Sequence, residues 1–357
     1  MAQIRSKPFG VTKEGANVTE YILSNPGGLT VSVLDYGCVI KSIIVPAKNG
    51  PVDVVVGHDT MADYEADFNS SGSTCCGAFV GRYANRIENA VFTVGGKTYQ
   101  LEANNGPNHL HGCFSRKLYR VKSFGDTLLM EAESPDGEDG FPGNLKIAVR
   151  YTLTEDNAFR MDYRVSSDAD TIVNLTNHSY FNLDGGGDVL NQKLRIYASR
   201  YLEGNNQCCP TGAILPVADT PMDFTAGKLI GREIDTGFAQ TTMVGGGYDH
   251  CYVIDRARGS SKSICAWATS DKTGISMKLY TTQPGIQLYT ANFLQDCPSP
   301  GKGGKPLQKY GGFALETQHY PCSPSHPEFP STVLRAGKVF RANTTLRFFT
   351  GKQCGKL

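Results

Sequence analysis

The chain has 357 residues, and its 35 Lys and Arg residues almost balance its 34 Asp and Glu residues, so that the formal net charge at pH 7 is +1. This balance provides no basic surface for nucleic acid or an anionic membrane, and we predict that neither is a partner. No apolar run approaches the roughly 18–20 residues that a membrane helix needs. The first ten residues, MAQIRSKPFG, lack the apolar stretch of a signal peptide. We therefore expect a soluble globular protein of the cytoplasm.

The 11 cysteines also favour a reducing compartment. Their number is odd, and no two of them have the C-x-x-C spacing of a zinc ribbon or a thioredoxin-type motif. The chain ends in Gly355-Lys356-Leu357, which differs from the Ser-Lys-Leu peroxisomal address at its first position. A peroxisome-like organelle is therefore the alternative to the cytoplasm.

Alternation with a period of two dominates the sequence. In Leu29–Tyr36, apolar and polar residues alternate up to Gly37, which is typical of a strand. Further strands are predicted, in chain order, over Ile40–Val45, Val52–Val56, Leu145–Leu153, Phe159–Val165, Leu194–Ala198, Ser276–Thr281 and Leu346–Phe349. Thr60–Phe68 is the one good candidate for a short helix, and the crossover helices of a parallel fold are missing. The pattern predicts an all-β fold, a large antiparallel β-sandwich with few short helices, in a single domain over residues 1–357.

One glycine- and proline-rich stretch, Pro298–Pro306, separates two strand-like segments. We interpret it as a long surface loop rather than a domain boundary. Its Gly and Lys residues do not form a phosphate-binding loop, because Pro306 stands where a helix should begin.

A polar pattern runs through Val173–Leu183. If this segment is a strand, one of its faces carries only hydrogen-bonding side chains: Asn174, Thr176, His178, Tyr180 and Asn182. A row of such groups on a concave sheet suits a polyhydroxylated ligand such as a sugar. The alternative is a histidine that is satisfied within a structural polar network.

Two further segments carry candidate chemistry. On a strand, His109 and His111 would lie on the same side, as in a metal-binding pair, but further ligands at suitable spacing are not evident, which favours a catalytic or sugar-contacting histidine or an ordinary turn. Glu316 lies in the mostly apolar run Phe313–His319, and carboxylates are seldom buried without a partner or a purpose. A structural ion pair is the alternative for Glu316. Asp249, taken alone, reads as a surface group.

Six motifs occur together in one order. They are Gly81-Arg-Tyr-Ala-Asn-Arg-Ile87, Leu110-His-Gly112, Asn174-Leu-Thr-Asn-His-Ser-Tyr-Phe-Asn-Leu183, Gly247-Tyr-Asp-His250, Thr282-Gln-Pro-Gly-Ile-Gln287 and Leu315-Glu-Thr-Gln318. This series resembles the aldose 1-epimerase (galactose mutarotase) family, over a span from about Phe9 to about Phe349. The resemblance implies a large antiparallel β-sandwich that holds a sugar in an open cleft.

The resemblance also implies roles for seven residues. Glu316 would be the general base that removes the proton from the anomeric hydroxyl, and His178 the general acid that protonates the ring oxygen, so that the ring opens and closes again as the other anomer. His111 would be the second active-site histidine, near the anomeric centre. The positions that match the family's sugar-hydroxyl ligands are Asn85, Arg86, Asp249 and Gln287. Ordinary pKa values near 4.3 for Glu and 6.5 for His would leave Glu316 ionised and His178 titrating near neutral pH.

These inferences lead to an isomerase that acts on free aldoses such as galactose and glucose, as a monomer or homodimer, without a metal or an organic cofactor. Three alternatives remain open. A sugar-binding module would not need both Glu316 and His178, and a glycoside hydrolase that pairs Glu316 with Asp249 would leave the histidine-rich segments unexplained. An epimerase for hexose 6-phosphates would need more cations in the cleft, for which Arg86 and the loop with Lys302 and Lys305 are the candidates. Two cysteines depart from the family pattern, Cys113 in place of a second glycine and Cys322 in place of an aspartate.

Overall fold

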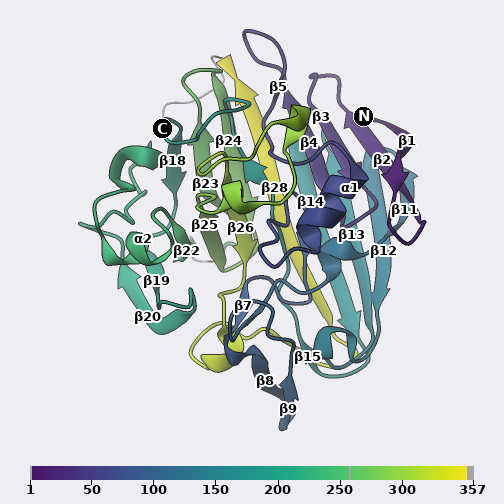
Figure 1. The fold of residues 1–357 in the computed structure, drawn as a ribbon, viewed down its shortest axis with the longest axis vertical. Coiled ribbons are helices and arrows are strands. Elements are labelled where there is room, and N and C mark those ends of the chain that lie inside the picture. Colours follow the sequence, from purple (N-terminus) through teal and green to yellow (C-terminus); the bar gives the residue numbers. More distant parts are fainter. Residues whose placement is uncertain (1, 257–258, 352–357) are drawn as a thin grey trace.

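Antiparallel strands make up most of the regular structure in the computed structural model, which describes residues 2–256 and 259–351 (Figure 1). The largest sheet has nine strands, in the spatial order β11 (Arg120–Phe124), β12 (Thr127–Ser134), β13 (Leu145–Leu153), β14 (Ala158–Ser167), β28 (Val339–Thr350), β24 (Ile275–Thr281), β23 (Ser263–Thr269), β18 (Lys193–Ile196) and β21 (Lys228–Leu229). A six-stranded sheet has the order β17 (Tyr180–Phe181), β26 (Phe313–Gln318), β25 (Gly285–Tyr289), β22 (Asp249–Val253), β19 (Arg200–Gly204) and β20 (Pro210–Pro216).

A five-stranded sheet is formed by the N-terminal segment, in sequential order: β1 (Gln3–Val11), β2 (Asn17–Ser24), β3 (Thr30–Leu34), β4 (Ile40–Val45) and β5 (Val52–Asp53). Four short pairs complete the strands: β10 (His109–Leu110) with β7 (Arg86–Ile87), β15 (Thr171–Ile172) with β27 (Val333–Leu334), β16 (Thr176–Asn177) with β6 (Phe79–Val80), and β8 (Val91–Val94) with β9 (Lys97–Gln100).

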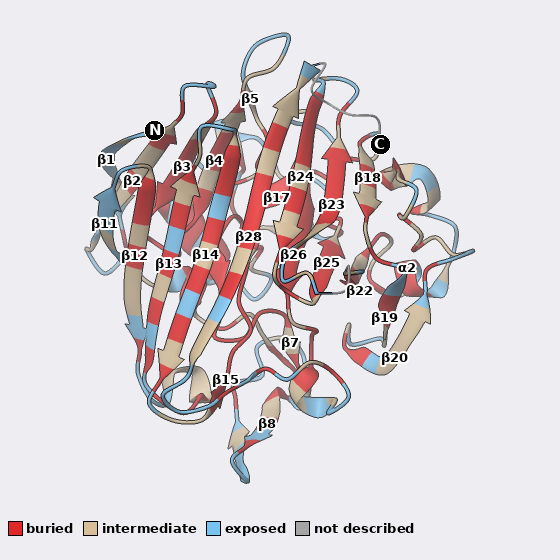
Figure 2. Cartoon of the chain, turned by 180° about the vertical axis from the view of Figure 1, so that it is seen from behind, coloured by how far each residue is buried: buried red, intermediate tan, exposed pale blue. Residues whose placement is uncertain are grey.

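The nine-stranded sheet forms one layer of a sandwich. Burial alternates along β13 and β14, so that one face of this sheet is covered and the other meets solvent, as the alternating bands in Figure 2 show. Its covered face contributes Tyr151 and Phe159 to a core that also contains Val31 of the five-stranded sheet and Leu288 and Leu315 of the six-stranded sheet. The burial of each such side chain stabilises the fold by about 1.5–3 kcal/mol. This shared core holds the two smaller sheets against the large one.

Helices are few in the described residues: α1 (Met61–Phe68), α2 (Ala239–Met243) and seven 3₁₀ turns, η1 (Glu88–Ala90), η2 (Phe114–Arg116), η3 (Glu138–Gly140), η4 (Ile230–Glu233), η5 (Leu294–Asp296), η6 (Lys302–Gly304) and η7 (Ser323–Ser325). Thr60 caps α1, because its hydroxyl accepts a hydrogen bond from the Asp63 N–H at 3.1 Å. The helix then buries the side chains of Met61, Tyr64 and Phe68. None of these helices is long and apolar enough to cross a membrane.

The predicted fold class is therefore confirmed, and several elements follow their predicted bounds. β4 and β13 match the predictions, and α1 begins one residue after its predicted start because Thr60 is its cap. β28 extends well beyond the predicted Leu346–Phe349 at its N-terminal end. The C-terminal tripeptide Gly355–Leu357 lies outside the described residues.

Candidate active site

One face of the six-stranded sheet carries a row of polar side chains. Glu316 on β26 lies directly opposite Gln287 on β25, and Asp249 lies two residues before Cys251, the partner of Gln287 on β22. Directly opposite residues, and residues two apart on one strand, share a face. The Gln287 Nε2 group donates a hydrogen bond of 2.7 Å to Asp249 Oδ1. The sheet thus brings two carboxylates and an amide together, while Leu315 points to the opposite face, into the core.

His178 reaches this row from a different segment. Its Nε2 atom lies 3.5 Å from Glu316 Oε1, and its ring packs against the rings of Tyr180 and His111, with centroid distances of 4.9 and 5.2 Å. His178 itself lies in the short connection between β16 and β17. The structure therefore places the predicted acid beside the predicted base.

The expectation that Val173–Leu183 forms one strand with a single polar face is wrong. The segment is broken into β16 and β17, which pair with different strands. The amide of Asn174 donates to the carbonyls of Ala84 and His319, and the amide of Asn182 donates to those of Gly187 and Gly311. These two asparagines hold neighbouring loops together, because their side chains replace the backbone partners that a regular strand would have supplied.

His111 enters the site through a sharp turn. Strand β10 ends at Leu110, and His111 adopts a left-handed conformation with φ of +64°. Gly112 follows at φ of +71°, where a Cβ atom would lie 2.5 Å from the Gly81 carbonyl oxygen, so only glycine fits. The predicted same-side arrangement of His109 and His111 is therefore wrong. His109 instead packs against Phe141 and bonds the Glu102 carbonyl through Nδ1.

One hydrogen bond fixes the tautomer of His111. The Asn85 N–H donates to His111 Nδ1 at 3.2 Å, so a neutral His111 carries its proton on Nε2 and can donate it to a ligand. The Asn85 side chain in turn accepts a hydrogen bond from the Arg86 N–H at 2.8 Å. Asn85 thus contacts His111 through its backbone N–H and the backbone of Arg86 through its side chain.

Arg86 faces the carboxylate row, whereas the first arginine of the same motif does not. Arg86 Nη1 lies 3.9 Å from Asp249 Oδ2, and Arg86 Nε donates to Asn105 Oδ1 at 2.9 Å. Arg82 is buried and donates to the carbonyls of Ser134, Pro135 and Pro142, which is a structural role. Asn105 was not predicted from the sequence. The signal for it is the turn sequence Asn104-Asn105-Gly106-Pro107 shortly before His109.

Burial and charge change the pKa values of the central pair. Burial, together with the negative charge of Asp249, raises the pKa of Glu316 to about 8, although Arg86 opposes this rise. Burial lowers the pKa of His178 to about 4 and holds the pKa of His111 well below its ordinary value. The expected ionised Glu316 and titrating His178 are therefore corrected: near neutral pH, the carboxyl holds the proton and the imidazole is neutral.

Three polar atoms at this site have no hydrogen-bond partner within the described residues. They are Glu316 Oε2, Gln287 Oε1 and His178 Nδ1, all on buried side chains. Buried polar atoms are bonded in the great majority of cases, so a cluster of exceptions indicates the place of a polar ligand. The side chains of Arg86 and Asp249 are 12% and 16% exposed, which gives such a ligand access from solvent.

Donor atoms of His111, His178 and Glu316 also lie within 4.8 Å of one another. A continuous series of contacts thus links all seven predicted site residues: Asn85, Arg86, His111, His178, Asp249, Gln287 and Glu316.

Comparison with known proteins gives a consistent result. A family model described as "Aldose 1-epimerase" matches residues 19–347. The chain is 35% identical over 354 residues to a galactose mutarotase from Rattus norvegicus, covering 98% of this chain and 99% of the relative. It is 36% identical over 334 residues to an aldose 1-epimerase from Escherichia coli K12, covering 91% and 94%. Among solved structures, an aldose epimerase homologue from C. elegans has a TM-score of 0.84 at 29% identity, covering 98% of this chain and 99% of the other.

Proposed function

Since the chain belongs to the aldose 1-epimerase family, it is an isomerase that interconverts the α- and β-anomers of an aldose, and we propose that it acts on free galactose and glucose with Glu316 and His178 as the proton-transfer pair. The observation that carries this assignment is the contact between His178 Nε2 and Glu316 Oε1 at 3.5 Å, beside buried polar atoms that have no partner. Anomer exchange requires both a general acid and a general base, whereas sugar binding alone requires neither.

The pair carries one shared proton between about pH 4 and about pH 8, because the pKa of His178 lies near 4 and that of Glu316 near 8. In the reactive form, this proton is on His178 and Glu316 is a carboxylate. Glu316 removes the proton from the anomeric hydroxyl, and the electrons of the O–H bond form the aldehyde carbonyl. The bond between C1 and the ring oxygen breaks, and the ring oxygen takes the proton from His178. Rotation about C1–C2 and the reverse transfers give the other anomer and restore the pair.

The remaining residues position the sugar. Asp249 is a charged acceptor held by Gln287 Nε2, so that Gln287 Oε1 stays available for a sugar hydroxyl. His111 donates through Nε2, because its Nδ1 is occupied by the Asn85 N–H. Arg86 supplies the positive charge beside Asp249.

Two of the candidate phosphate ligands are engaged by other groups. Lys302, a candidate phosphate ligand, bonds Asp53 at 2.7 Å and the Val55 carbonyl at 2.8 Å. Arg86 is engaged with Asp249 and Asn105. Free aldoses therefore remain the proposed substrates. The single domain, the monomeric or homodimeric state and the cytoplasmic compartment stay predictions.

Polarimetry on freshly dissolved α-galactose and α-glucose tests the function. We expect the purified chain to speed equilibration far beyond the spontaneous rate, and Glu316→Gln to remove most of this effect. Glu20→Gln is the matched control, because Glu20 is also buried but contacts Ser32 and Lys7 on the five-stranded sheet.

Two outcomes would count against the proposal. If both free sugars follow the buffer curve while a hexose 6-phosphate is accelerated, the substrate assignment is wrong. If Glu316→Gln turns over near the normal rate, Glu316 is not the base.

A further inference from the structure

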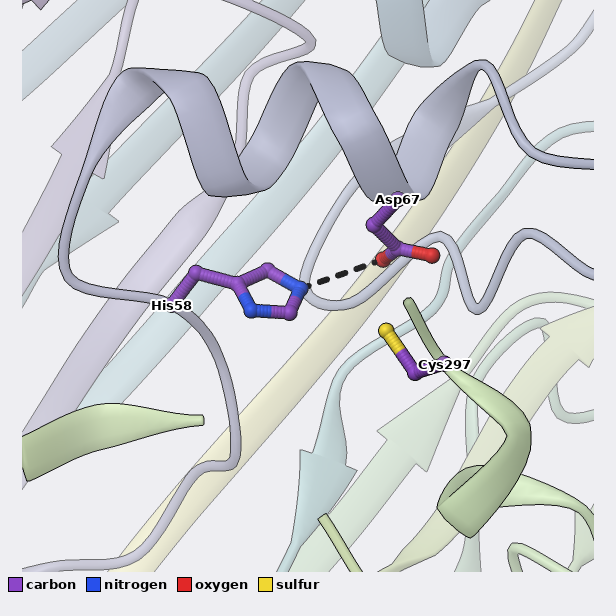
Figure 3. Close-up of side chains that lie close together, drawn as sticks. All are labelled: His58, Asp67 and Cys297. Carbon is purple, nitrogen blue, oxygen red and sulfur yellow. Dashed lines mark hydrogen bonds and ion pairs between the residues drawn. The ribbon is translucent and has the colours of Figure 1, made fainter. Parts of the chain in front are cut away.

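Three side chains that are far apart in the sequence lie close together in the structure, and all three are of types that can bind a metal ion. His58 lies between β5 and α1, Asp67 in the last turn of α1, and Cys297 directly after η5. Donor atoms of all three lie within 4.8 Å of one another. Figure 3 shows the Cys297 sulfur pointing toward the carboxylate of Asp67 and the ring of His58. His58 and Asp67 are fully buried, and Cys297 is half-buried.

Neighbouring groups orient the donors. The His58 Nδ1 group bonds the Pro300 carbonyl at 2.7 Å, which leaves Nε2 to face Asp67 Oδ2 at 3.2 Å. Metal-bound histidines usually donate their second ring N–H to a carbonyl or carboxylate in this way. The Thr74 N–H donates to Asp67 Oδ1 at 2.8 Å and fixes the carboxylate.

The spacing suits zinc. Ligands at about 2.0–2.1 Å from a tetrahedral zinc ion lie about 3.3 Å apart, close to the 3.2 Å between His58 Nε2 and Asp67 Oδ2. One imidazole, one carboxylate and one thiolate also form a donor set that zinc prefers over magnesium or calcium. The carboxylate and the thiolate together balance the two positive charges of the ion.

We propose that His58 Nε2, Asp67 Oδ2 and Cys297 Sγ bind one zinc ion, with a water molecule as the fourth ligand. The ion takes the place of the hydrogen bond between His58 Nε2 and Asp67 Oδ2, and any proton on His58 Nε2 or Cys297 Sγ is released to solvent. The ion cross-links α1 to the loop that follows η5. This loop already rests on the same region, since Ser299 Oγ donates to the Asp63 carbonyl at 2.9 Å and the Gly303 N–H donates to Asp59 at 2.6 Å.

Cobalt(II) is the probe for the test. The full chain is stripped with a chelator, dialysed and titrated with Co²⁺, while the visible d–d bands and the near-ultraviolet thiolate-to-cobalt band are recorded. We expect one ion per chain, a thiolate band, and displacement by Zn²⁺. Cys297→Ser should remove the thiolate band and weaken binding by at least the 10–100-fold that loss of an outer-shell partner costs. Cys113→Ser, at another half-buried cysteine, is the matched control and should change neither the thiolate band nor the affinity for cobalt.

Further variants separate this cluster from the catalytic one. His58→Gln should weaken cobalt binding like Cys297→Ser, and it keeps the test decisive if one of the two variants fails to fold. Glu316→Gln should leave binding unchanged. Loss of the ion in Glu316→Gln, with retention in Cys297→Ser, would place it at the cluster of His111, His178 and Glu316 and overturn the proposal. Absence of a thiolate band in the wild-type chain would overturn it as well.

Discussion

The molecule contains two buried pairs of a histidine and a carboxylate, with similar spacing and opposite electrostatics. His178 Nε2 lies 3.5 Å from Glu316, and His58 Nε2 lies 3.2 Å from Asp67. Burial lowers the pKa of His178 to about 4. Burial also opposes protonation of His58, but hydrogen bonds to Asp67, Cys297 and the Pro300 carbonyl outweigh it and raise the pKa of His58 to about 10.

The difference lies in the partners, because all four side chains are buried. Asp67 accepts hydrogen bonds from Thr74 as well as His58, and both nitrogens of His58 are bonded. Glu316 Oε2 and His178 Nδ1 have no partner within the described residues. Without a bound metal ion, the satisfied pair supports a charged histidine, and the proposed zinc ion would replace the proton on His58 Nε2. The other pair leaves polar atoms that a ligand can bond.

The largest expected effect is on turnover and distinguishes the two histidines. His178→Asn should lower kcat for anomer exchange by about 10²–10⁴-fold, since a positioned acid or base contributes that much. His58→Asn, the same chemical change in the other pair, should leave kcat within about twofold. Polarimetry at 25 °C and neutral pH measures both. Equal losses in the two variants would show that the first loss comes from disturbed folding, and would remove His178 from the reaction.

The second effect concerns the free energy of unfolding, for which we expect the larger loss in the pair of His58 and Asp67. Asp67→Asn should reduce the free energy of unfolding by about 3–5 kcal/mol, because it leaves a buried histidine without its counter-charge. Glu316→Gln should cost far less, because Glu316 Oε2 has no partner to lose. Urea unfolding at pH 7, with a chelator present so that no metal contributes, compares the two variants. A larger loss in Glu316→Gln would contradict the contrast between the pairs.

The third effect is a dependence of the unfolding free energy on pH that is caused by the titration of Glu316. Its pKa is about 8 in the folded chain against an ordinary 4.5. The folded state therefore holds the proton more tightly than the unfolded state, and the resulting stability is fully present below about pH 4.5 and is lost as pH rises toward 8. Each unit of separation corresponds to about 1.4 kcal/mol. Urea unfolding from pH 4.5 to 9 should show this decline in the wild type and a flatter curve in Glu316→Gln. Parallel curves would mean that Glu316 does not titrate in this range.

The sequence predicts elements well where a local pattern decides them. β13 alternates cleanly and matches its predicted bounds, and Thr60 caps α1 through a local contact. The break between β16 and β17 was missed, because the carbonyls that Asn174 and Asn182 bond belong to residues as distant as His319 and Gly311. Such partners leave no local signal.

For the candidate site, too, the sequence predicts what a local motif decides and misses what depends on distant residues. The motifs bring out Glu316 and His178, but their altered pKa values depend on burial and on the charge of Asp249, which only the folded chain reveals. His58 and Cys297 form no recognisable motif, since they lie 239 positions apart in the sequence. Their convergence follows from the way the loop after η5 rests on α1.

The smallest effect is a shift in the pH–rate profile. Because the pair must carry one proton, kcat/KM should be level between about pH 4 and about pH 8 and fall on either side, after the spontaneous rate is subtracted. The charge of Asp249 helps to raise the pKa of Glu316, so Asp249→Asn should move the upper limb to lower pH. It should also raise KM by about 10–100-fold, because a hydrogen bond to a charged group contributes about 1.5–3 kcal/mol. His58→Asn should move neither limb, because His58 and Asp67 are not part of the candidate site. An upper limb that stays in place in Asp249→Asn would show that burial alone sets the pKa of Glu316.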